Sequence, residues 1–235
     1  MWNGKMKALT FSYDDGLETD VRLAEIFNRY GMKCTFNLNG GRLYTRENLP
    51  PPYMKTSRRR PDVTPVYRLP LEDMPAVYAG HEIAGHSYNH PFLAELPREE
   101  VEREISRDIE THIRLFGKRP LGMAYPQGSY NDMVVDVVRA NGLRYARTSG
   151  LTGTFDMPED LLRLKSTCHH NSPRLMELAE AFVNMQPDTP QLFYIYGHSY
   201  EFAADDNWDV IERFCSFMAG HDDIFYGTNA EVLLD

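Results

Sequence analysis

The 235-residue sequence predicts an α/β fold in which parallel strands close into a barrel. Two observations lead to this prediction. Apolar and β-branched segments alternate along the chain with amphipathic segments of helical period, which is typical of βαβ units. The alternation gives seven or eight strands, and barrels of this class commonly run to roughly 200–250 residues as one domain. We therefore expect a single domain over residues 1–235.

The expected strands are short runs bounded by turn or capping residues. The first, MKALTFSY, is almost continuously apolar, as expected for a strand buried on both faces. In chain order, the expected strands are residues 6–13, 33–38, 81–87, 121–126, 143–148, 161–167, 191–199 and 224–228.

The expected helices fill the intervals between these strands. In chain order they are residues 18–31, 71–80, 97–117, 131–142, 172–185 and 207–220. The segment 97–117 has the clearest helical pattern, because charged residues separate apolar residues at four-residue spacing: Val101, Ile105, Ile109 and Ile113. Asn131 and Ser172 are the expected N-caps of their helices, and Gly31 is an expected C-terminal stop. Pro173 suits the first helical position after Ser172.

Residues 40–70 interrupt the alternation. This segment contains six prolines and a run of three arginines, Arg58 to Arg60. Long loops inside compact domains are uncommon and often functional. We expect an irregular excursion here that lies on the substrate side of the barrel.

The composition excludes several classes of protein. The formal charge of −9 and the pI near 5.4 argue against a nucleic-acid-binding protein, which needs a basic field. The arginine run is interpreted as solvated surface. Cys34, Cys168 and Cys215 are too widely spaced for a metal motif and too few for a disulfide framework.

The chain shows no membrane or secretion signal. It has no apolar run of 18 or more residues, and its N-terminus lacks the apolar core of a signal peptide. Together with the cysteine usage, this favours a reducing compartment, and we expect a cytoplasmic protein that binds neither membrane nor nucleic acid. Nothing in the motifs specifies an oligomeric state.

Polar residues gather where the predicted strands end. Asp14 and Asp15 follow the first strand, His86 and His90 the third, and His198 the last long one. The stretch YPQGSY follows the fourth. Because active sites of such barrels lie at the carboxyl ends of the strands, we expect these residues to meet there.

The spacing within these stretches is consistent with a metal site. His86 and His90, in GHSYNH, would share one face of a helical turn and thus reach one cation, although two unrelated loop histidines would show the same pattern. SYDDG offers a carboxylate to complete a His₂-carboxylate set, although Asp-Asp-Gly is also common in turns. Of two adjacent acids, one can bind the cation while the other accepts a proton.

The motifs SYDDG, HSYNH, AYPQG and GHS, in this order, resemble those of the polysaccharide deacetylases of carbohydrate esterase family 4. The resemblance covers about residues 6–200. It implies a distorted (β/α) barrel, in agreement with the order of elements. It also implies a metal-dependent hydrolase that removes N-acetyl or O-acetyl groups from a carbohydrate, here a soluble oligosaccharide or sugar derivative.

The resemblance assigns roles residue by residue. Asp15, His86 and His90 match the metal ligands. Asp14 matches the catalytic base, and His198 matches the general acid. The backbone N–H of Gln127 occupies the position that helps to hold the oxyanion. The implied cofactor is a divalent metal, with zinc favoured and cobalt, nickel or manganese compatible with the ligands.

The sequence departs from the family pattern at several positions. Ala124 replaces the arginine that pairs with the base, Gln127 replaces an aromatic residue, and Tyr196 replaces a leucine. No residue matches the acid that orients the general acid, and Glu201 is a candidate by proximity to His198. The candidates for the substrate groove are Tyr125, Pro126, His170 and Glu201.

Two other interpretations stay open at this point. The missing arginine would fit a carbohydrate-binding relative with weakened catalysis. A hydrolase of a small non-sugar amide would use the same metal ligands and the same base. A substrate panel with small cyclic amides and acetylated sugars separates these interpretations.

Overall fold

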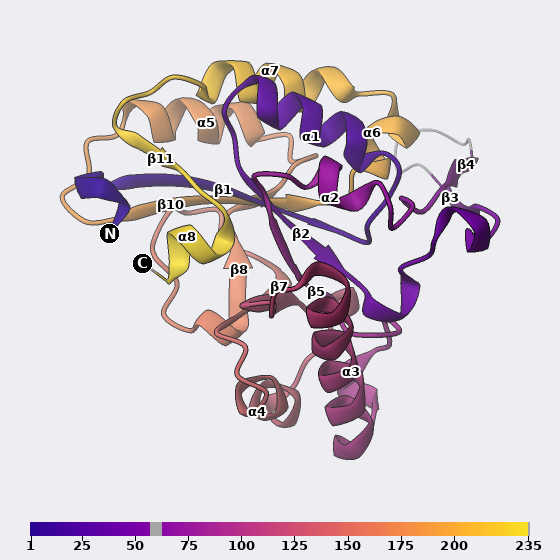
Figure 1. Ribbon diagram of the computed structural model, residues 1–235. Helices are drawn as coiled ribbons and strands as arrows, with labels where there is room; N and C mark the ends of the chain where they lie inside the picture. The colour runs from indigo at the N-terminus through magenta and orange to yellow at the C-terminus, as the bar shows by residue number, and fades with distance from the viewer. Residues whose placement is uncertain (57–62, 235) are drawn as a thin grey trace.

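The computed structural model describes residues 1–56 and 63–234, and these form a distorted (β/α) barrel (Figure 1). The sheet is parallel and has the strand order β8-β7-β6-β5-β2-β1-β10-β9. Its strands are β1 (Lys7–Asp14), β2 (Cys34–Leu38), β5 (Glu82–Gly85), β6 (Gly122–Ala124), β7 (Tyr145–Leu151), β8 (Leu164–Ser166), β9 (Cys168–His169) and β10 (Gln191–Gly197). The strand β11 (Ile224–Tyr226) pairs with the first half of β1, next to β2.

One bent segment closes the barrel. The strand β8 pairs with β7, and β9, two residues later in the chain, pairs with β10 at the other end of the strand order. Thr167 lies between the two and donates its backbone N–H to Tyr194 O at 2.7 Å. With β8 and β9 counted as one bent strand, the described residues give a ring of seven strands, within the predicted range of seven or eight.

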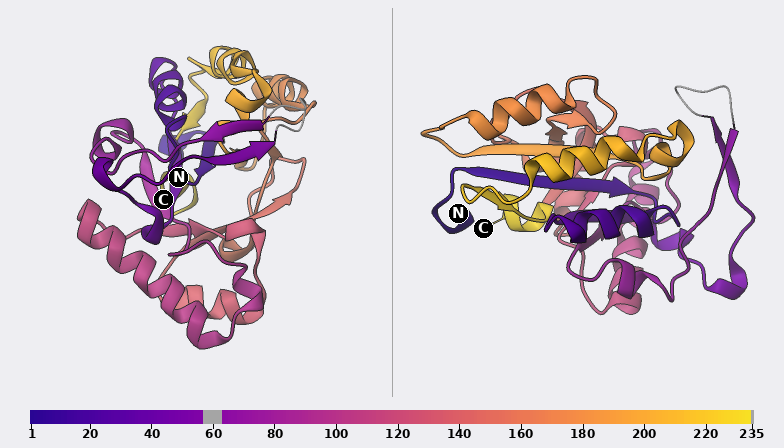
Figure 2. Two further views of the ribbon diagram at one scale, coloured as in Figure 1. Left: turned by 90° about the vertical axis from the view of Figure 1, so that its right-hand side faces the viewer. Right: turned by 90° about the horizontal axis from the view of Figure 1, so that it is seen from above.

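Helices cover the outside of the ring. The helices α1, α5 and α7 lie over β1 and β10, and α3 and α4 lie on the opposite side, by β5 and β6 (Figures 1 and 2). The helices are α1 (Asp20–Arg29), α2 (Met74–Val77), α3 (Arg98–Phe116), α4 (Asp132–Ala140), α5 (Leu175–Asn184), α6 (Tyr200–Asp205), α7 (Trp208–Met218) and α8 (Asn229–Leu233). Short 3-10 turns connect them: Trp2–Gly4, Gly40–Arg42, Arg46–Asn48, Leu93–Glu95, Pro126–Gly128 and Leu161–Arg163. Within the described ranges, no helix is both long and apolar enough to cross a membrane.

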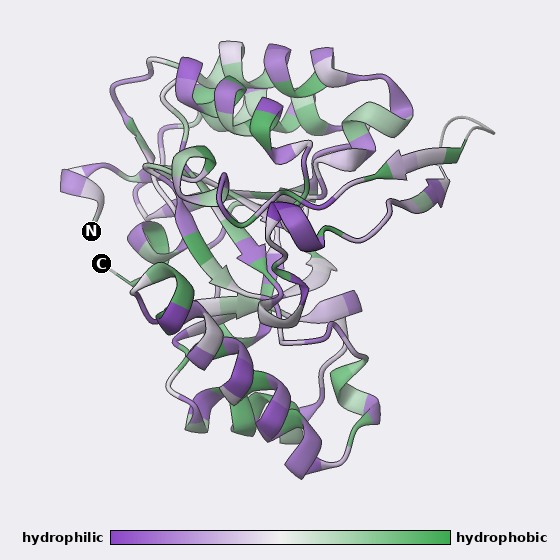
Figure 3. Ribbon diagram, turned by 45° about the vertical axis from the view of Figure 1, so that its right-hand side comes forward, coloured by the Kyte–Doolittle hydropathy of each residue, from purple (hydrophilic) through white to green (hydrophobic). Residues whose placement is uncertain are grey.

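The helices present apolar stripes to the sheet and polar stripes to solvent (Figure 3). In α3, Val101, Ile105 and Ile109 are buried as predicted, but Ile113 is 43% exposed. A step of four residues turns a helix by 400°, so the stripe drifts by about 40° per step. After three steps the predicted stripe has left the core-facing side, and His112 is buried in its place.

The predicted caps are confirmed in α4 and wrong in α5. Asn131 accepts a hydrogen bond from Val134 N at 3.0 Å at the start of α4. The helix α5 begins at Leu175, with Arg174 as its N-cap. Ser172 instead closes a turn before the helix, because its hydroxyl accepts a hydrogen bond from Arg174 N at 3.3 Å.

The segment 40–70 is more regular than predicted. Two 3-10 turns are followed by an antiparallel hairpin of β3 (Tyr53–Thr56) and β4 (Val63–Val66). The hairpin projects from the end of the barrel where β1 ends (Figures 1 and 2). The arginine run lies outside the described residues.

The opposite end of the barrel is closed by the two ends of the chain. Trp2 is 2% exposed and donates its indole N–H to Val232 O, in α8, at 3.0 Å. The short helices α6 and α8 were not predicted, because one to two turns carry no recognisable apolar period. The capping box of α8, Thr228 with Glu231, was the available signal.

Candidate functional site

The predicted metal ligands, base and proton donor come together at the carboxyl ends of three strands. Asp14 is the last residue of β1, and Asp15 follows it. His86 follows β5 directly, and His198 follows β10. The convergence expected from the sequence is therefore present in the barrel.

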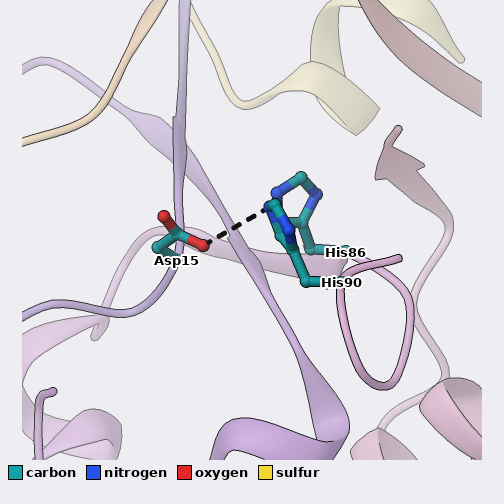
Figure 4. A group of neighbouring side chains, drawn as sticks. All are labelled: Asp15, His86 and His90. Carbon is teal, nitrogen blue, oxygen red and sulfur yellow. Dashed lines mark ion pairs between the residues drawn. The ribbon is translucent and has the colours of Figure 1, made fainter. Parts of the chain in front are cut away.

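Asp15 points a free carboxylate oxygen into this region. Its φ angle of 86° turns the chain sharply after β1, and the following residue, Gly16, is also left-handed. Oδ1 of Asp15 is buried and has no hydrogen-bond partner. It lies 3.8 Å from His90 Nε2 (Figure 4).

His86 and His90 meet through a loop rather than the helical turn that the spacing suggested. Ser87 and His90 both have positive φ angles, 57° and 63°, and these fold the loop back on itself. The two imidazole rings are 4.8 Å apart and nearly perpendicular. Burial, with His86 adding to the effect, lowers the pKa of His90 to about 4, so its imidazole is neutral at pH 7.

The tautomer of His86 is fixed by its neighbour in β6. His86 Nδ1 lies 2.8 Å from Ala124 O, and a carbonyl only accepts hydrogen bonds. Nδ1 therefore carries the proton, and Nε2 presents its lone pair to the site. Position 124, which lacks the arginine side chain of the family pattern, thus contributes through its backbone.

A buried carboxylate of α3 holds the loop that carries His86. Asp108 accepts hydrogen bonds from Gly40 N at 2.6 Å and from His86 N at 3.2 Å. A Cβ atom at Gly85 would lie 2.6 Å from Asp108 Oδ2, so the contact needs glycine there. Asp108 was not predicted, because in the sequence it resembles any other charge in a helix rich in charged residues.

Asp15, His86 and His90 together have the properties of a metal site. Their ligand atoms all lie within 4.8 Å of one another. Two imidazole nitrogens and one carboxylate oxygen form the donor set of catalytic zinc sites, and Oδ1 of Asp15, which lacks a hydrogen-bond partner, is suited to bind a cation. Burial raises the pKa of Asp15, but His198, His86 and Arg68 lower it to about 2, so the carboxylate is ionised.

Asp14 is held in a different way from its neighbour. It is 4% exposed, accepts a hydrogen bond from Asn37 Nδ2 at 2.8 Å on Oδ1, and accepts one from Arg147 Nη2 at 2.5 Å on Oδ2. The same Oδ2 lies 4.0 Å from His86 Nε2 and 3.9 Å from His198 Nε2. Burial raises the pKa of Asp14, but Arg147, His86 and His198 hold it below its ordinary value.

Arg147 supplies the positive charge beside Asp14 that the family pattern supplies from an arginine at position 124. It comes from β7, the strand next to β6, and pairs with Ala124 in the sheet. It is 2% exposed, and its Nε and Nη1 donate hydrogen bonds to Ser12 Oγ and Thr148 O. The sequence analysis missed it, although an arginine at the end of the buried run LRYART was a signal.

His198 lies beside Asp14 and is backed by Glu201. Its side chain is 29% exposed. Nδ1 of His198 lies 3.9 Å from Glu201 Oε1, which places the predicted orienting acid near the ring but beyond hydrogen-bond length. Glu201 is in the first turn of α6.

All four groove candidates are buried, including Glu201 at 6% exposure. Tyr125 is 2% exposed and donates its hydroxyl to Leu162 O at 2.9 Å, and Pro126 is buried beside it. His170 is fully buried between Tyr13 and Phe202. Tyr125, Pro126 and His170 each lie within two residues of the end of a strand, but their burial keeps their side chains from lining an open groove.

Gln127 has an exposed side chain in the turn after β6, with a φ angle of 57°. It therefore lies at the same end of the barrel as the aspartates and histidines. Its role at the oxyanion stays a prediction.

The hairpin segment contributes one more residue that was not predicted. Arg68 follows β4, is 9% exposed and donates a hydrogen bond to Asp15 O. Its Nη1 lies 3.9 Å from Asp15 Oδ1, and its guanidinium lies over the ring of Tyr53. The excursion between β2 and β5 thus reaches the site.

Comparison with known proteins places the chain in a family. The sequence model of the polysaccharide deacetylase family matches residues 3–146, more than half of the chain. An uncharacterized Bacillus subtilis protein, YlxY, is 34% identical over 58 residues, which are 25% of this chain and 18% of that protein.

Solved structures share the fold at low sequence identity. A family 4 carbohydrate esterase from Streptomyces lividans, solved with acetate, has a TM-score of 0.54 at 18% identity over 95% of this chain and 92% of its own. The esterase domain of a xylanase from the hindgut metagenome of Trinervitermes trinervoides has a TM-score of 0.58 at 15% identity over 96% and 89%. A pseudoenzyme of the same esterase family from Bacillus anthracis has a TM-score of 0.53 at 18% identity over 99% and 66%.

Proposed function

The chain belongs to the polysaccharide deacetylase family, and we propose on this basis that it is a metal-dependent deacetylase of an acetylated carbohydrate. One observation carries the proposal. The unpartnered Oδ1 of Asp15 shares a small volume with His86 and His90, while the adjacent Asp14 is held apart by Arg147. The two neighbouring carboxylates therefore have different environments and are suited to different roles.

Asp15, His86 and His90 would hold the metal. A divalent ion of the zinc type supplies Lewis-acid chemistry, since it polarises a carbonyl oxygen and makes a water molecule more acidic. Asp15 gives the charge, and His86 gives the nitrogen whose lone pair Ala124 O directs into the site. The neutral His90 gives the second nitrogen.

Asp14 acts as the general base. Its Oδ2 faces both His86 and His198 and takes the proton of the attacking water, while Oδ1 stays bonded to Asn37. Arg147 keeps the carboxylate ionised and fixes its direction. General-base catalysis of this kind typically contributes about 10²–10⁴-fold in rate.

His198 donates the proton to the leaving group. Water adds to the acetyl carbon, the bond to nitrogen or oxygen breaks, and acetate leaves as the amine or alcohol receives the proton. The half-exposed ring lies next to the base, with Glu201 behind it to stabilise the charged form. The backbone N–H of Gln127 stabilises the oxyanion, a contribution of about 3–4 kcal/mol for one donor.

The substrate is an acetylated sugar or oligosaccharide. Tyr53, on the hairpin, and Tyr200, on α6, both lie beside Lys55 at the site end of the barrel. Aromatic rings at a mouth of this kind suit the apolar faces of sugar rings. The N-acetyl and O-acetyl forms carry the same acetyl carbonyl group, which a metal held by Asp15, His86 and His90 would polarise.

Arg147 weakens the alternative of a binding protein that has lost catalysis. That interpretation depended on the missing arginine at position 124, and Arg147 supplies the cation from the neighbouring strand. The ligands, the base and the proton donor are all present. Hydrolysis of a small non-sugar amide uses the same groups, so a substrate panel has to include it.

The test measures acetate release from acetylated substrates, and ring opening of cyclic amides, by chelator-treated protein before and after zinc is restored. The panel contains N-acetylated and O-acetylated oligosaccharides, their monosaccharides and small cyclic amides. We expect zinc-dependent acetate release from at least one acetylated carbohydrate. Zinc-dependent turnover of the cyclic amides alone would contradict the carbohydrate assignment, and no turnover at any zinc loading would contradict the enzyme.

A further inference from the structure

A second group of metal-ligating side chains lies on the far side of His198 from the aspartates. His169 is the last residue of β9, and Glu201 lies in the first turn of α6. His169, His198 and Glu201 each offer one ligand atom, and these three atoms all lie within 4.8 Å of one another. The donor set is again two imidazoles and one carboxylate.

The geometry leaves ligand atoms of this group without hydrogen bonds. Glu201 is 6% exposed, its Oε2 lies 3.0 Å from His169 Nε2, and its Oε1 lies 3.9 Å from His198 Nδ1. Glu201 Oε2 and His198 Nδ1 are buried and lack a hydrogen-bond partner of good geometry. A buried carboxylate oxygen and a buried imidazole nitrogen that both lack a hydrogen bond are costly without a cation.

Glu201 is held in the ionised form that a cation needs. Burial raises its pKa, but contacts from His169 and His170 hold the pKa well below its usual range. His170 is fully buried, with Nε2 3.1 Å from Glu201 Oε2. A Cβ atom at Gly197 would lie 2.0 Å from His170 Nδ1, so the glycine makes room for this ring. Among the described residues, every ion pair of Glu201 is with a histidine, and none is with lysine or arginine.

We propose that His169, His198 and Glu201 form a second binding site for a divalent cation of the zinc type. The chemistry of this donor set matches first-row ions better than magnesium or calcium, which take oxygen ligands. The inference deepens the proposed function, because it shares His198 with that mechanism. A cation at this site binds the His198 nitrogen that faces Glu201, so an excess of metal slows the reaction by engaging the proton donor.

The experiment counts bound zinc ions. Chelator-treated protein is dialysed against rising free zinc, and zinc per chain is measured by elemental analysis. The wild type is expected to reach two equivalents. His169→Ala and Glu201→Gln are each expected to lose the zinc ion of the second site and keep the ion at Asp15, His86 and His90. His90→Ala is expected to lose the ion at Asp15 and His86 and keep the ion of the second site. His221→Ala is the matched control and should keep both equivalents, because His221 is partly exposed and its Nε2 is bonded to Phe217 O.

The result depends on folded variants, so each is compared by circular dichroism and by the visible spectrum of bound cobalt. The second site would be overturned if the folded wild type saturates at one zinc ion per chain, and if that ion is lost in His90→Ala but kept in His169→Ala. Acetate release that is equal at one and two equivalents would overturn its action on His198. The number of zinc ions per chain is measured without reference to turnover. A protein that binds two ions but releases no acetate at one equivalent of zinc refutes only the proposed function, and one that is active with one saturating ion refutes only the second site.

Discussion

The two ends of the barrel both bury charged side chains, but they satisfy them differently. At the amino end of the strands, Lys7 is 2% exposed and donates hydrogen bonds to Phe182 O, Val183 O and Met185 O at 3.2, 2.8 and 3.2 Å. At the carboxyl end, Asp15 is mostly buried and its Oδ1 has no hydrogen-bond partner. Residues of similar burial are therefore fully hydrogen-bonded at one end of the barrel and left with an unbonded oxygen at the other.

Glu82 shows the same pattern at the amino end. Its carboxylate accepts hydrogen bonds from Thr35 Oγ1, Tyr145 OH and Ala230 N at 2.8, 2.8 and 3.0 Å. A carboxylate with three donors has little left to offer a ligand. The two ends therefore differ in whether buried polar atoms have hydrogen-bond partners, and not in whether they bury charge.

The largest effect on stability is expected at Arg147, which belongs to the functional end but is fully bonded. Arg147→Met leaves Asp14 buried without its main cation. We expect a loss of about 3–5 kcal/mol in the free energy of unfolding, as for other broken buried pairs. The pKa of Asp14 then rises, so the acidic limb of the pH–rate profile moves to higher pH.

The measurements are urea denaturation and acetate release against pH. Arg139→Met is the matched control, because Arg139 forms an exposed pair with Asp136, and such pairs contribute at most about 1 kcal/mol. An acidic limb that stays in place in folded Arg147→Met protein would show that Arg147 does not tune the base.

A smaller effect is expected from Lys7→Met at the amino end. The variant leaves three carbonyls at the end of α5 without their donor and should lower the free energy of unfolding by about 2–4 kcal/mol. Zinc content and turnover per folded molecule should stay at the wild-type level. A Lys7→Met variant with the unfolding free energy of the wild type but slower acetate release would contradict the distinction between the two ends.

The sequence predicted those site residues that lie directly at the end of an apolar strand segment. Asp14, Asp15, His86 and His198 follow apolar runs directly, so strand alternation and the order of motifs were enough to place them at one end. Arg147 and Asp108 could not be found in this way, because their partners are far away in sequence and only the packed sheet brings them together. The burial of Tyr125 and His170 also depends on which face a strand end presents, and the sequence does not specify where each strand stops.

The smallest expected effect concerns Asp20, a carboxylate at the functional end that is fully bonded. It accepts hydrogen bonds from Leu17 N, Tyr78 OH and Ser199 Oγ. Burial raises its pKa from 3.8 to about 6, despite these hydrogen bonds. The folded state therefore binds the proton more tightly than the unfolded state, and this contribution to stability is full below pH 3.8 and lost as the pH rises through about 6.

We expect Asp20→Asn to remove this pH dependence. The difference in unfolding free energy between wild type and variant should change by at most about 1.4 kcal/mol per pH unit, and only between about pH 4 and 6. Denaturation at several pH values in this window gives the difference directly. A difference that is constant with pH would contradict the raised pKa.

The central claim is that two adjacent carboxylates divide the work, with Asp15 as metal ligand and Asp14 as base. The most direct test measures zinc content and acetate release side by side in Asp15→Ala, Asp14→Asn and the wild type. The claim predicts that Asp15→Ala loses the zinc ion held by His86 and His90 and also loses turnover. It predicts that Asp14→Asn keeps that ion and loses about 10²–10⁴-fold in turnover. A zinc-loaded Asp14→Asn protein with full activity, or an Asp15→Ala protein that retains this ion, would contradict it.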